Sequence, residues 1–173
     1  MTTMYTAIPV REVPYPHGLG KLEYKALEND MKRLLGDRQT DVDTNAARFW
    51  DTDYQTLVRR HLAPRFDVAG DIVEIARDAL VRAEATGVLG VSYRTTHEAR
   101  DSYTAALPPR PYHRPPGAAG AVDGWLRNPP QLYRDSAGTL SVGDGRHRLR
   151  YLRSLVQPTD PGFLVLVRIT TDE

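Results

Sequence analysis

The residues best suited to chemistry lie in one stretch, TLSVGDGRHRLRYLR, which runs from Thr139 to Arg153. This stretch passes from a β-like run through Gly-Asp-Gly into four arginines and one histidine. A strand, a glycine turn and a helix N-terminus together favour an anion, because backbone N–H groups and a partial positive charge meet there. The planar guanidinium group of arginine can also hold two phosphate oxygens at once. The pattern therefore favours an anion, especially phosphate, at this turn, where Gly143 and Gly145 let a ligand approach the backbone and Arg146, His147 and Arg148 follow.

A helix that begins at Gly145 sorts its residues onto two sides. The apolar side holds Leu149, Leu152 and Val156. The basic side holds Arg146, Arg150 and Arg153, at positions i, i+4 and i+7. We expect the apolar side to pack on a sheet and the guanidinium groups to face outward, with Arg150 among the phosphate contacts. A solvated arginine face without any ligand is an equally open interpretation of this pattern.

Asp144 and His147 each have several open roles. Asp144 can cap the helix, pair with an arginine, or help to hold a metal ion that accompanies a nucleotide, and capping is the simplest expectation. His147 can contact phosphate, act as an acid or base, or orient a neighbouring group. Arg148 lies nearer the apolar side than the other arginines do. It is therefore expected to reach back beneath the turn and to be structural as well as ligand-binding.

The N-terminal half of the sequence predicts one strand followed by helices. Residues 5–13 are suited to a first strand, and residues 22–87 to a helical region. In that region, a first helix is expected over residues 22–35. The clearest helix, over residues 70–87, carries apolar residues at every third or fourth position, with Asp71 as its N-cap.

Between these two helices, a further helix is expected from Asp43 or Thr44 to Pro64, because proline interrupts helical hydrogen bonding. Its apolar face is expected to hold Trp50, Tyr54, Leu57, Val58 and His61. We interpret His61 as a satisfied core residue, since one side chain cannot build a metal site.

The C-terminal half predicts a proline-rich loop and then strands on both sides of the motif helix. Residues 107–120 contain five prolines and two glycines, so we expect an irregular loop there. It is either a passive connection or a surface for a protein partner. Short strands are expected at residues 130–134 and 139–143, and the apolar residues 163–169 predict a strand covered on both faces. The whole chain, residues 1–173, is thus predicted to be a single α+β domain with a small mixed sheet.

Composition narrows the class of protein. Apolar residues make up 40% and charged residues 26% of the sequence, as in folded globular proteins. No apolar run approaches the roughly 18 residues of a membrane span, and no secretory signal is recognised at the N-terminus. The absence of cysteine excludes disulfides and thiolate chemistry. These features favour the cytoplasm, without a membrane partner. The formal net charge of +1 argues against strong attraction of the whole molecule to nucleic acid.

The stretch LSVGDGRHRLRYLRSL resembles the motif of the ParB/sulfiredoxin-like superfamily. In that family a strand runs into Asp-Gly-x-His-Arg-Leu, or a related Gly-x-x-Arg motif, and then into a helix. The preceding PPQLYRDSAGT and the terminal FLVLVRI resemble the family's flanking strands. The resemblance covers residues 128–169, roughly a quarter of the chain, and makes residues 22–87 an elaboration of a ParB-like core.

The resemblance implies that the turn binds nucleotide phosphates. Members of the family include DNA-partitioning proteins that bind and hydrolyse CTP, a free-serine kinase, nucleases and sulfiredoxins. By analogy, the ligand is a CTP- or ATP-like nucleotide, accompanied by Mg²⁺. The phosphate contacts implied are Gly145, Arg146, His147 and Arg148, with Asp144 nearby. Sulfiredoxin chemistry needs a cysteine in the motif, which this chain lacks.

Three functional hypotheses follow. In the first, the chain binds a nucleotide and hydrolyses it or transfers its phosphate, with Glu12, Asp144 and His147 as the candidate catalytic residues. In the second, it is a non-enzymatic protein whose arginine stripe contacts the DNA backbone, with strong salt dependence and little sequence preference. In the third, it is a protein-interaction or inhibitory factor with a relic motif. A short, arginine-rich, cysteine-free chain of this kind suits a bacterial or phage accessory protein.

Overall fold

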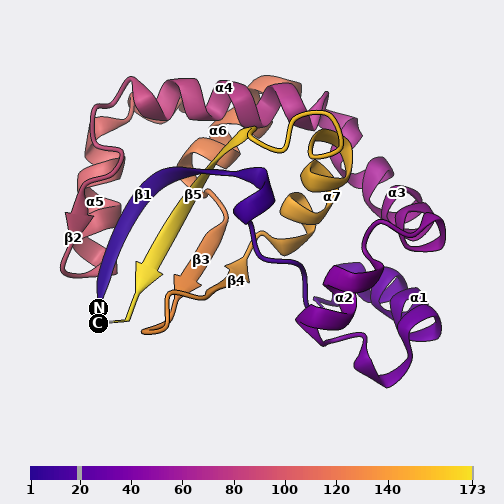
Figure 1. Ribbon diagram of the computed structural model, residues 1–173. Helices are drawn as coiled ribbons and strands as arrows, with labels where there is room; N and C mark the ends of the chain where they lie inside the picture. Colours follow the sequence, from indigo (N-terminus) through magenta and orange to yellow (C-terminus); the bar gives the residue numbers. More distant parts are fainter. Residues whose placement is uncertain (19–20, 173) are drawn as a thin grey trace.

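The apolar run near the C-terminus forms the central strand of a five-stranded mixed sheet in the computed structural model, which describes residues 1–18 and 21–172 (Figure 1). The strands, in their order across the sheet, are β2 (Ser92–Tyr93), β1 (Thr2–Pro9), β5 (Leu164–Thr171), β3 (Gln131–Arg134) and β4 (Leu140–Asp144). Of the strand pairs in the described range, β3 and β5 run parallel and the others run antiparallel. The predicted α+β class is confirmed.

Strand β5 is covered on both faces, as its sequence predicts. Val165, Leu166 and Val167 follow one another along the strand and are each 0% exposed. Side chains of successive residues point to opposite faces of a sheet, so packing on both faces is needed to bury all three. In its antiparallel partner β1, Thr2 pairs with Thr171 of β5. The start of β1 and the end of β5 therefore lie side by side.

The helices form two groups around this sheet (Figure 1). In the first group, α4 (Ile72–Glu84) packs on β5 and on α6 (Gly117–Arg127), while α5 (Thr96–Ala106) packs on β1. The start of α4 confirms the expected cap, because the Asp71 carboxylate accepts a hydrogen bond from the N–H of Val73. None of the helices in the described range is both long and apolar enough to cross a membrane.

The second group lies beside the motif helix α7 (Arg146–Val156) and contacts it mainly through one helix (Figure 1). It consists of α1 (Lys25–Leu35), α2 (Val42–Arg48) and α3 (Thr52–Phe66), and α3 contacts both α1 and α7. The predicted helical region therefore divides between two places: α4 packs on the sheet, whereas α1 and α3 pack near α7. Single 3₁₀ turns occupy Val10–Glu12, Leu22–Tyr24, Gly36–Arg38 and Asp67–Ala69.

The single helix expected over residues 43–64 is wrong, because the chain forms α2 and α3 with a break between them. The Arg48 side chain pairs with Asp51 and Asp53 across that break. Pro64 lies inside α3 and does not end it, because the helix continues to Phe66 although the proline lacks the N–H for one intrahelical hydrogen bond. Trp50 falls in the break and is 42% exposed, so it is not part of the buried face.

His61 is satisfied, as expected, with its Nε2 atom 2.7 Å from the Asp30 carboxylate. The first strand starts earlier and ends sooner than the predicted 5–13. After Pro9 the chain leaves the β1–β5 ladder, and the N–H of Val10 donates to the carbonyl of Phe163 in the connection before β5.

The predicted irregular loop over residues 107–120 is shorter than expected, because α6 already begins at Gly117. Helix α5 was not expected at all. Its sequence signal is a Thr95-x-x-Glu98 pattern, and the Thr95 hydroxyl does accept a hydrogen bond from the N–H of Glu98.

Candidate functional site

The predicted strand, glycine turn and helix are confirmed at the motif. Strand β4 ends at Asp144, Gly145 adopts the left-handed conformation with φ of 80°, and α7 begins at Arg146. A Cβ atom at position 145 would lie 2.9 Å from the Cβ atom of Pro130, so the turn needs glycine for its conformation and for its close packing. No side chain caps α7 at Gly145, which leaves the first N–H groups of the helix without that partner.

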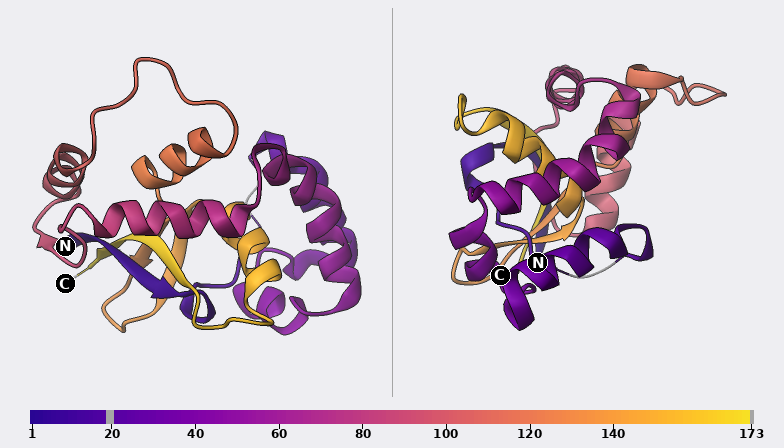
Figure 2. Two further views of the ribbon diagram at one scale, coloured as in Figure 1. Left: turned by 90° about the horizontal axis from the view of Figure 1, so that it is seen from above. Right: turned by 90° about the vertical axis from the view of Figure 1, so that its right-hand side faces the viewer.

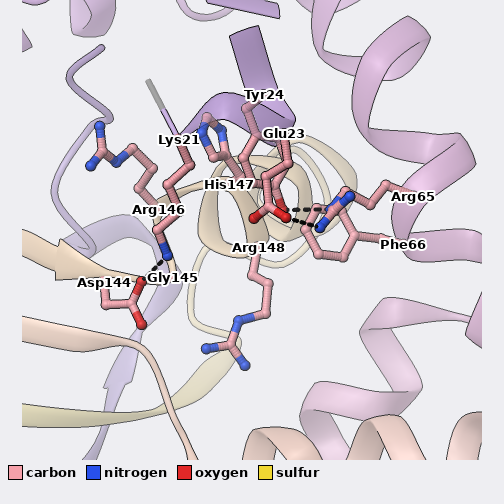
Figure 3. Close-up of a pocket in the computed structure, with 10 residues that line it drawn as sticks. All are labelled: Lys21, Glu23, Tyr24, Arg65, Phe66, Asp144, Gly145, Arg146, His147 and Arg148. Carbon is pink, nitrogen blue, oxygen red and sulfur yellow. Dashed lines mark hydrogen bonds and ion pairs between the residues drawn. The ribbon is translucent and has the colours of Figure 1, made fainter. Parts of the chain in front are cut away.

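A cavity of about 410 Å³ opens beside this helix N-terminus (Figure 3). Three segments line it: Lys21, Glu23 and Tyr24 before α1; Arg65 and Phe66 at the end of α3; and Asp144 to Arg148 at the turn. The N-terminal helical group and the motif therefore build this cavity together. Lys21, Tyr24, Arg65 and Phe66 were not predicted as site residues, because nothing in their local sequence distinguishes them.

Both carboxylates of the cavity are held in ion pairs (Figure 3). The Nζ atom of Lys21 lies 2.9 Å from the Asp144 carboxylate, and the Nη2 atom of Arg65 lies 2.7 Å from that of Glu23. Burial alone would raise the pKa of Asp144, but the hydrogen bonds from Lys21 and from the N–H of Gly145 outweigh it and lower that pKa. The expectation that Asp144 caps the helix is wrong, because the N-cap residue is Gly145 and, among the described residues, the Asp144 carboxylate accepts from Lys21 and from the N–H of Gly145, not from the first turn of α7.

The two arginines of the turn point to opposite sides of the helix end (Figure 3). Arg146 donates to the carbonyl of His17, at 2.9 Å. Arg148 reaches back beneath the turn, as predicted, and donates to the carbonyl of Asn128, also at 2.9 Å. Among the described residues, no carboxylate forms an ion pair with Arg148. Its guanidinium is therefore a cation of the cavity without an ion-pair partner among the described residues, although Asp144 interacts with it electrostatically.

His147 is buried in the cavity wall with an unsatisfied imidazole ring. Its side chain is 6% exposed, and its ring lies against that of Tyr24 at a tilt of 31°, with centroids 3.9 Å apart. Neither ring nitrogen has a hydrogen-bond partner in the described part of the chain, and the nearest acid, Glu28, lies 3.8 Å from Nε2. Burial, then Arg150 and Arg146, lower the pKa of His147 to about 3. The ring is therefore neutral at physiological pH, with one N–H to donate.

The predicted outward-facing arginine stripe is wrong. Arg150 is 2% and Arg153 is 1% exposed, because α1, α3 and the segment after β1 cover that side of α7. The Nη1 atom of Arg150 lies 3.4 Å from the carboxylate of Glu28. Arg153 stacks over the ring of Tyr15 at 4.1 Å.

Arg153 also donates to the backbone carbonyls of Val10 and Val13. Arg150 and Arg153 thus stabilise the fold, because they connect α7 to α1 and to the segment after β1. Neither lines the cavity beside the turn.

Glu28 is the acidic residue that sequence reasoning missed. It lies three residues before the buried Met31 on the same face of α1, and this spacing was the available signal. Glu12, by contrast, lies in the 3₁₀ turn after β1, and its half-exposed carboxylate is 3.9 Å from Arg11. It does not line the cavity beside the turn. Gly143 lies outside this cavity as well, where the ring of Tyr133 fills the space that a Cβ atom would need.

A protein-built magnesium site does not fit the described residues. They contain no group of three or more His, Asp or Glu side chains placed to hold a metal ion. The two carboxylates of the cavity are engaged by Lys21 and Arg65. The Mg²⁺ expected with a nucleoside triphosphate would therefore enter as part of the ligand, bound by its phosphates.

Comparisons with protein-family models, with curated proteins and with solved structures find no match to this chain.

Proposed function

We propose that this protein binds the phosphate groups of a nucleotide at the N-terminus of α7, in the manner of a ParB-like domain. One observation carries the proposal. The cavity that exposes the uncapped start of α7 also contains His147, a buried side chain without a hydrogen-bond partner. A buried polar group that lacks a partner is unfavourable, and such groups are rare in folded proteins. A phosphate oxygen that accepts from this imidazole would satisfy it.

The charges around the cavity support an anionic ligand. Four cationic side chains line it, those of Lys21, Arg65, Arg146 and Arg148, and no described carboxylate lies within ion-pair distance of Arg148. In our proposal, the first backbone N–H groups of α7 and the guanidinium of Arg148 bind phosphate oxygens directly. Lys21 exchanges the carboxylate of Asp144 for a phosphate when the ligand enters.

Binding is better supported than turnover. A general base works best when its pKa lies near the working pH, and the pKa of His147 is lowered to about 3. Asp144 and Glu23 are both engaged in ion pairs, and Glu12 lies outside the cavity. The DNA hypothesis is weakened because Arg150 and Arg153, two of the three arginines expected to contact the DNA backbone, are buried.

The test is calorimetry with inorganic triphosphate, CTP, ATP and GTP, each with and without Mg²⁺. We expect binding to the wild type and a loss of about tenfold or more in affinity in Arg148→Met, because a charge-assisted hydrogen bond contributes about 1.5–3 kcal/mol. The control is Arg33→Met, which removes an arginine that is 80% exposed and belongs to α1. The absence of binding at millimolar concentration would refute the proposal. Affinity that grows with oligonucleotide length and collapses with salt would favour the DNA hypothesis.

A further inference from the structure

A second cavity, of about 310 Å³, adjoins the first. Arg65, Phe66 and Arg148 line both cavities, so the two share a common wall. The other walls of the second cavity come from the start of α4, from α6 and from the loop that precedes α6. That loop arches away from the body and returns beside the junction of α3 and α4 (Figure 2).

The second cavity combines an apolar surface with cationic side chains. Its apolar lining consists of Phe66, Ala69, Ile72, Ile75, Ala121 and Trp125. Four arginines also line it: Arg65, Arg110, Arg114 and Arg148. Its acidic residue, Asp123, is engaged by Arg127 at 2.9 Å. Such a cavity fits a planar ring with apolar faces that is attached to an anion, and it repels a cation.

Arg148 connects the two cavities. It belongs to the turn that begins α7, yet its guanidinium lies 5.1 Å from the centre of the Trp125 ring. A planar guanidinium over an aromatic face is a favourable arrangement, and its other face can stack on a further planar group. One side chain can therefore bind a phosphate at the turn and support a ring in the second cavity.

The proline-rich loop supplies the remaining arginines. Arg114 returns from the loop onto α6, where its Nη2 atom lies 3.4 Å from the carbonyl of Gly120. A Cβ atom at Gly124 would lie 3.1 Å from the same Nη2 atom, so this glycine allows the guanidinium to approach the helix. The loop, which the sequence leaves as a passive connection or a protein-binding surface, thus forms one wall of this cavity.

We infer that the second cavity binds the base of the nucleotide whose phosphates bind at α7. The inference rests on the proposed phosphate site and extends it. The ligand is then a nucleoside phosphate. An inorganic phosphate fills only the cavity at the start of α7 and leaves the second cavity empty. The base lies between the α3–α4 junction and α6, and Arg148 lies between the base and the phosphates.

The test compares nucleoside triphosphates with inorganic triphosphate on variants that fill the second cavity. Ala121→Phe places a ring into it from α6, and Ala69→Phe does so from the opposite wall. The matched controls are Ala119→Phe, at an exposed position of α6, and Val68→Phe, at a side chain that is 82% exposed. Circular dichroism of each variant shows whether it folds. Because the two filling variants change different walls of the cavity, the test still gives an answer if one of them does not fold.

In the wild type, we expect the preferred nucleoside triphosphate to bind at least tenfold tighter than inorganic triphosphate. The two filling variants should lose this advantage while their affinity for inorganic triphosphate stays unchanged, and both controls should retain it. Equal affinity for the two ligands in the wild type, or an advantage that survives both filling variants, would overturn the base site alone. Failure of inorganic triphosphate and every nucleotide to bind would overturn the phosphate site and this inference together.

Discussion

Arg150 and Glu28 form a buried ion pair between the motif helix and the N-terminal helical group. The Nη1 atom of Arg150 lies 3.4 Å from the Oε1 atom of Glu28, although the two residues are 122 positions apart in the sequence. The Arg150 side chain is 1% exposed and that of Glu28 is 9% exposed. The same carboxylate lies 3.8 Å from His147, so the pair also sets the electrostatic surroundings of the cavity.

Removing the negative charge of this pair should destabilise the fold strongly. In Glu28→Gln the shape is kept, but Arg150 is left as a buried charge without its counter-ion, which costs about 3–5 kcal/mol. Urea unfolding, followed by circular dichroism, measures the change. The control is Glu74→Gln, since Glu74 pairs with Arg77 on the surface, where such pairs contribute little to stability. A loss below about 1 kcal/mol in Glu28→Gln would show that another group compensates Arg150.

The sequence predicts the turn well because its determinants are local. A strand, two glycines and an amphipathic helix follow one another within residues 139–156, and each depends on neighbours a few positions away. The exposure of the helix faces is not local. Whether Arg150 and Arg153 face water depends on segments more than a hundred positions earlier, and these segments cover them. The 3.6-residue period identifies two faces of α7, but it does not reveal that both are buried.

The same distinction between local and long-range determinants explains which residues of the cavity could be predicted. Asp144, Gly145, Arg146, His147 and Arg148 were predicted as site residues, and the structure brings all of them to its wall. The opposite wall comes from the segment before α1 and from the end of α3, which reach the motif only through tertiary packing. No spacing rule links these segments to the motif, so sequence reasoning could not assign them.

The next prediction concerns the glycine of the turn. Gly145→Ala should lose about 2–5 kcal/mol of stability, because left-handed backbone strain adds about 1–2 kcal/mol to the cost of overpacking against Pro130. Gly138→Ala is the matched control, since Gly138 has φ of 85° and a Cβ atom there would meet nothing within 4 Å. It should show the strain alone. Thermal or urea unfolding of both variants gives the difference, and equal losses would mean that the packing around Gly145 relaxes freely.

Stability should depend on pH through His147. Burial lowers its pKa in the folded state to about 3, whereas the unfolded chain binds this proton below about 6.5. The unfolded state therefore holds more protons between these values. Stability should be complete above about pH 6.5 and should fall as the pH drops, by at most about 1.4 kcal/mol per pH unit for this one group.

The measurement is urea unfolding at several pH values between about 5.5 and 7, a window that lies above the ordinary titration of carboxylates. His147→Phe should flatten the slope while keeping a ring against Tyr24. His17 contributes in the same direction, because burial, then Arg146 and Arg150, lower its pKa too. His17→Gln measures that share. An unchanged slope in His147→Phe would contradict the assignment to His147.

Neutralising Asp144 should strengthen the binding of phosphate in the absence of Mg²⁺. Asp144→Asn removes a negative charge from the cavity and frees Lys21, which lies 2.9 Å from that carboxylate. We expect affinity for inorganic triphosphate to rise severalfold, as measured by calorimetry in a metal-free buffer. Asp160→Asn, at an exposed carboxylate outside the cavity, is the control. A large loss of affinity that appears only with Mg²⁺ present would instead assign Asp144 to the metal ion that accompanies the ligand.

Phosphate binding should raise the pKa of His147. The free protein keeps this ring neutral through burial and through the positive charges of Arg150 and Arg146. A phosphate placed beside the ring offsets those charges and offers an acceptor to a protonated imidazole, so the charged form becomes more favourable. Binding then takes up a proton, and affinity should increase as the pH falls toward the raised pKa.

Nuclear magnetic resonance of the histidine Cε1–H groups can follow this titration directly, with and without saturating inorganic triphosphate. His147 should show no titration above about pH 5 in the free protein and a clear one in the complex. His97, whose side chain is 75% exposed on α5, serves as the internal control, and its signal at a given pH should be the same with and without triphosphate. If the His147 signal and the affinity both stay constant between about pH 5 and 7, the phosphate does not contact this imidazole. The α7 N-terminus would then have to bind the phosphate without His147, whose buried ring nitrogens lack a hydrogen-bond partner in the described part of the chain.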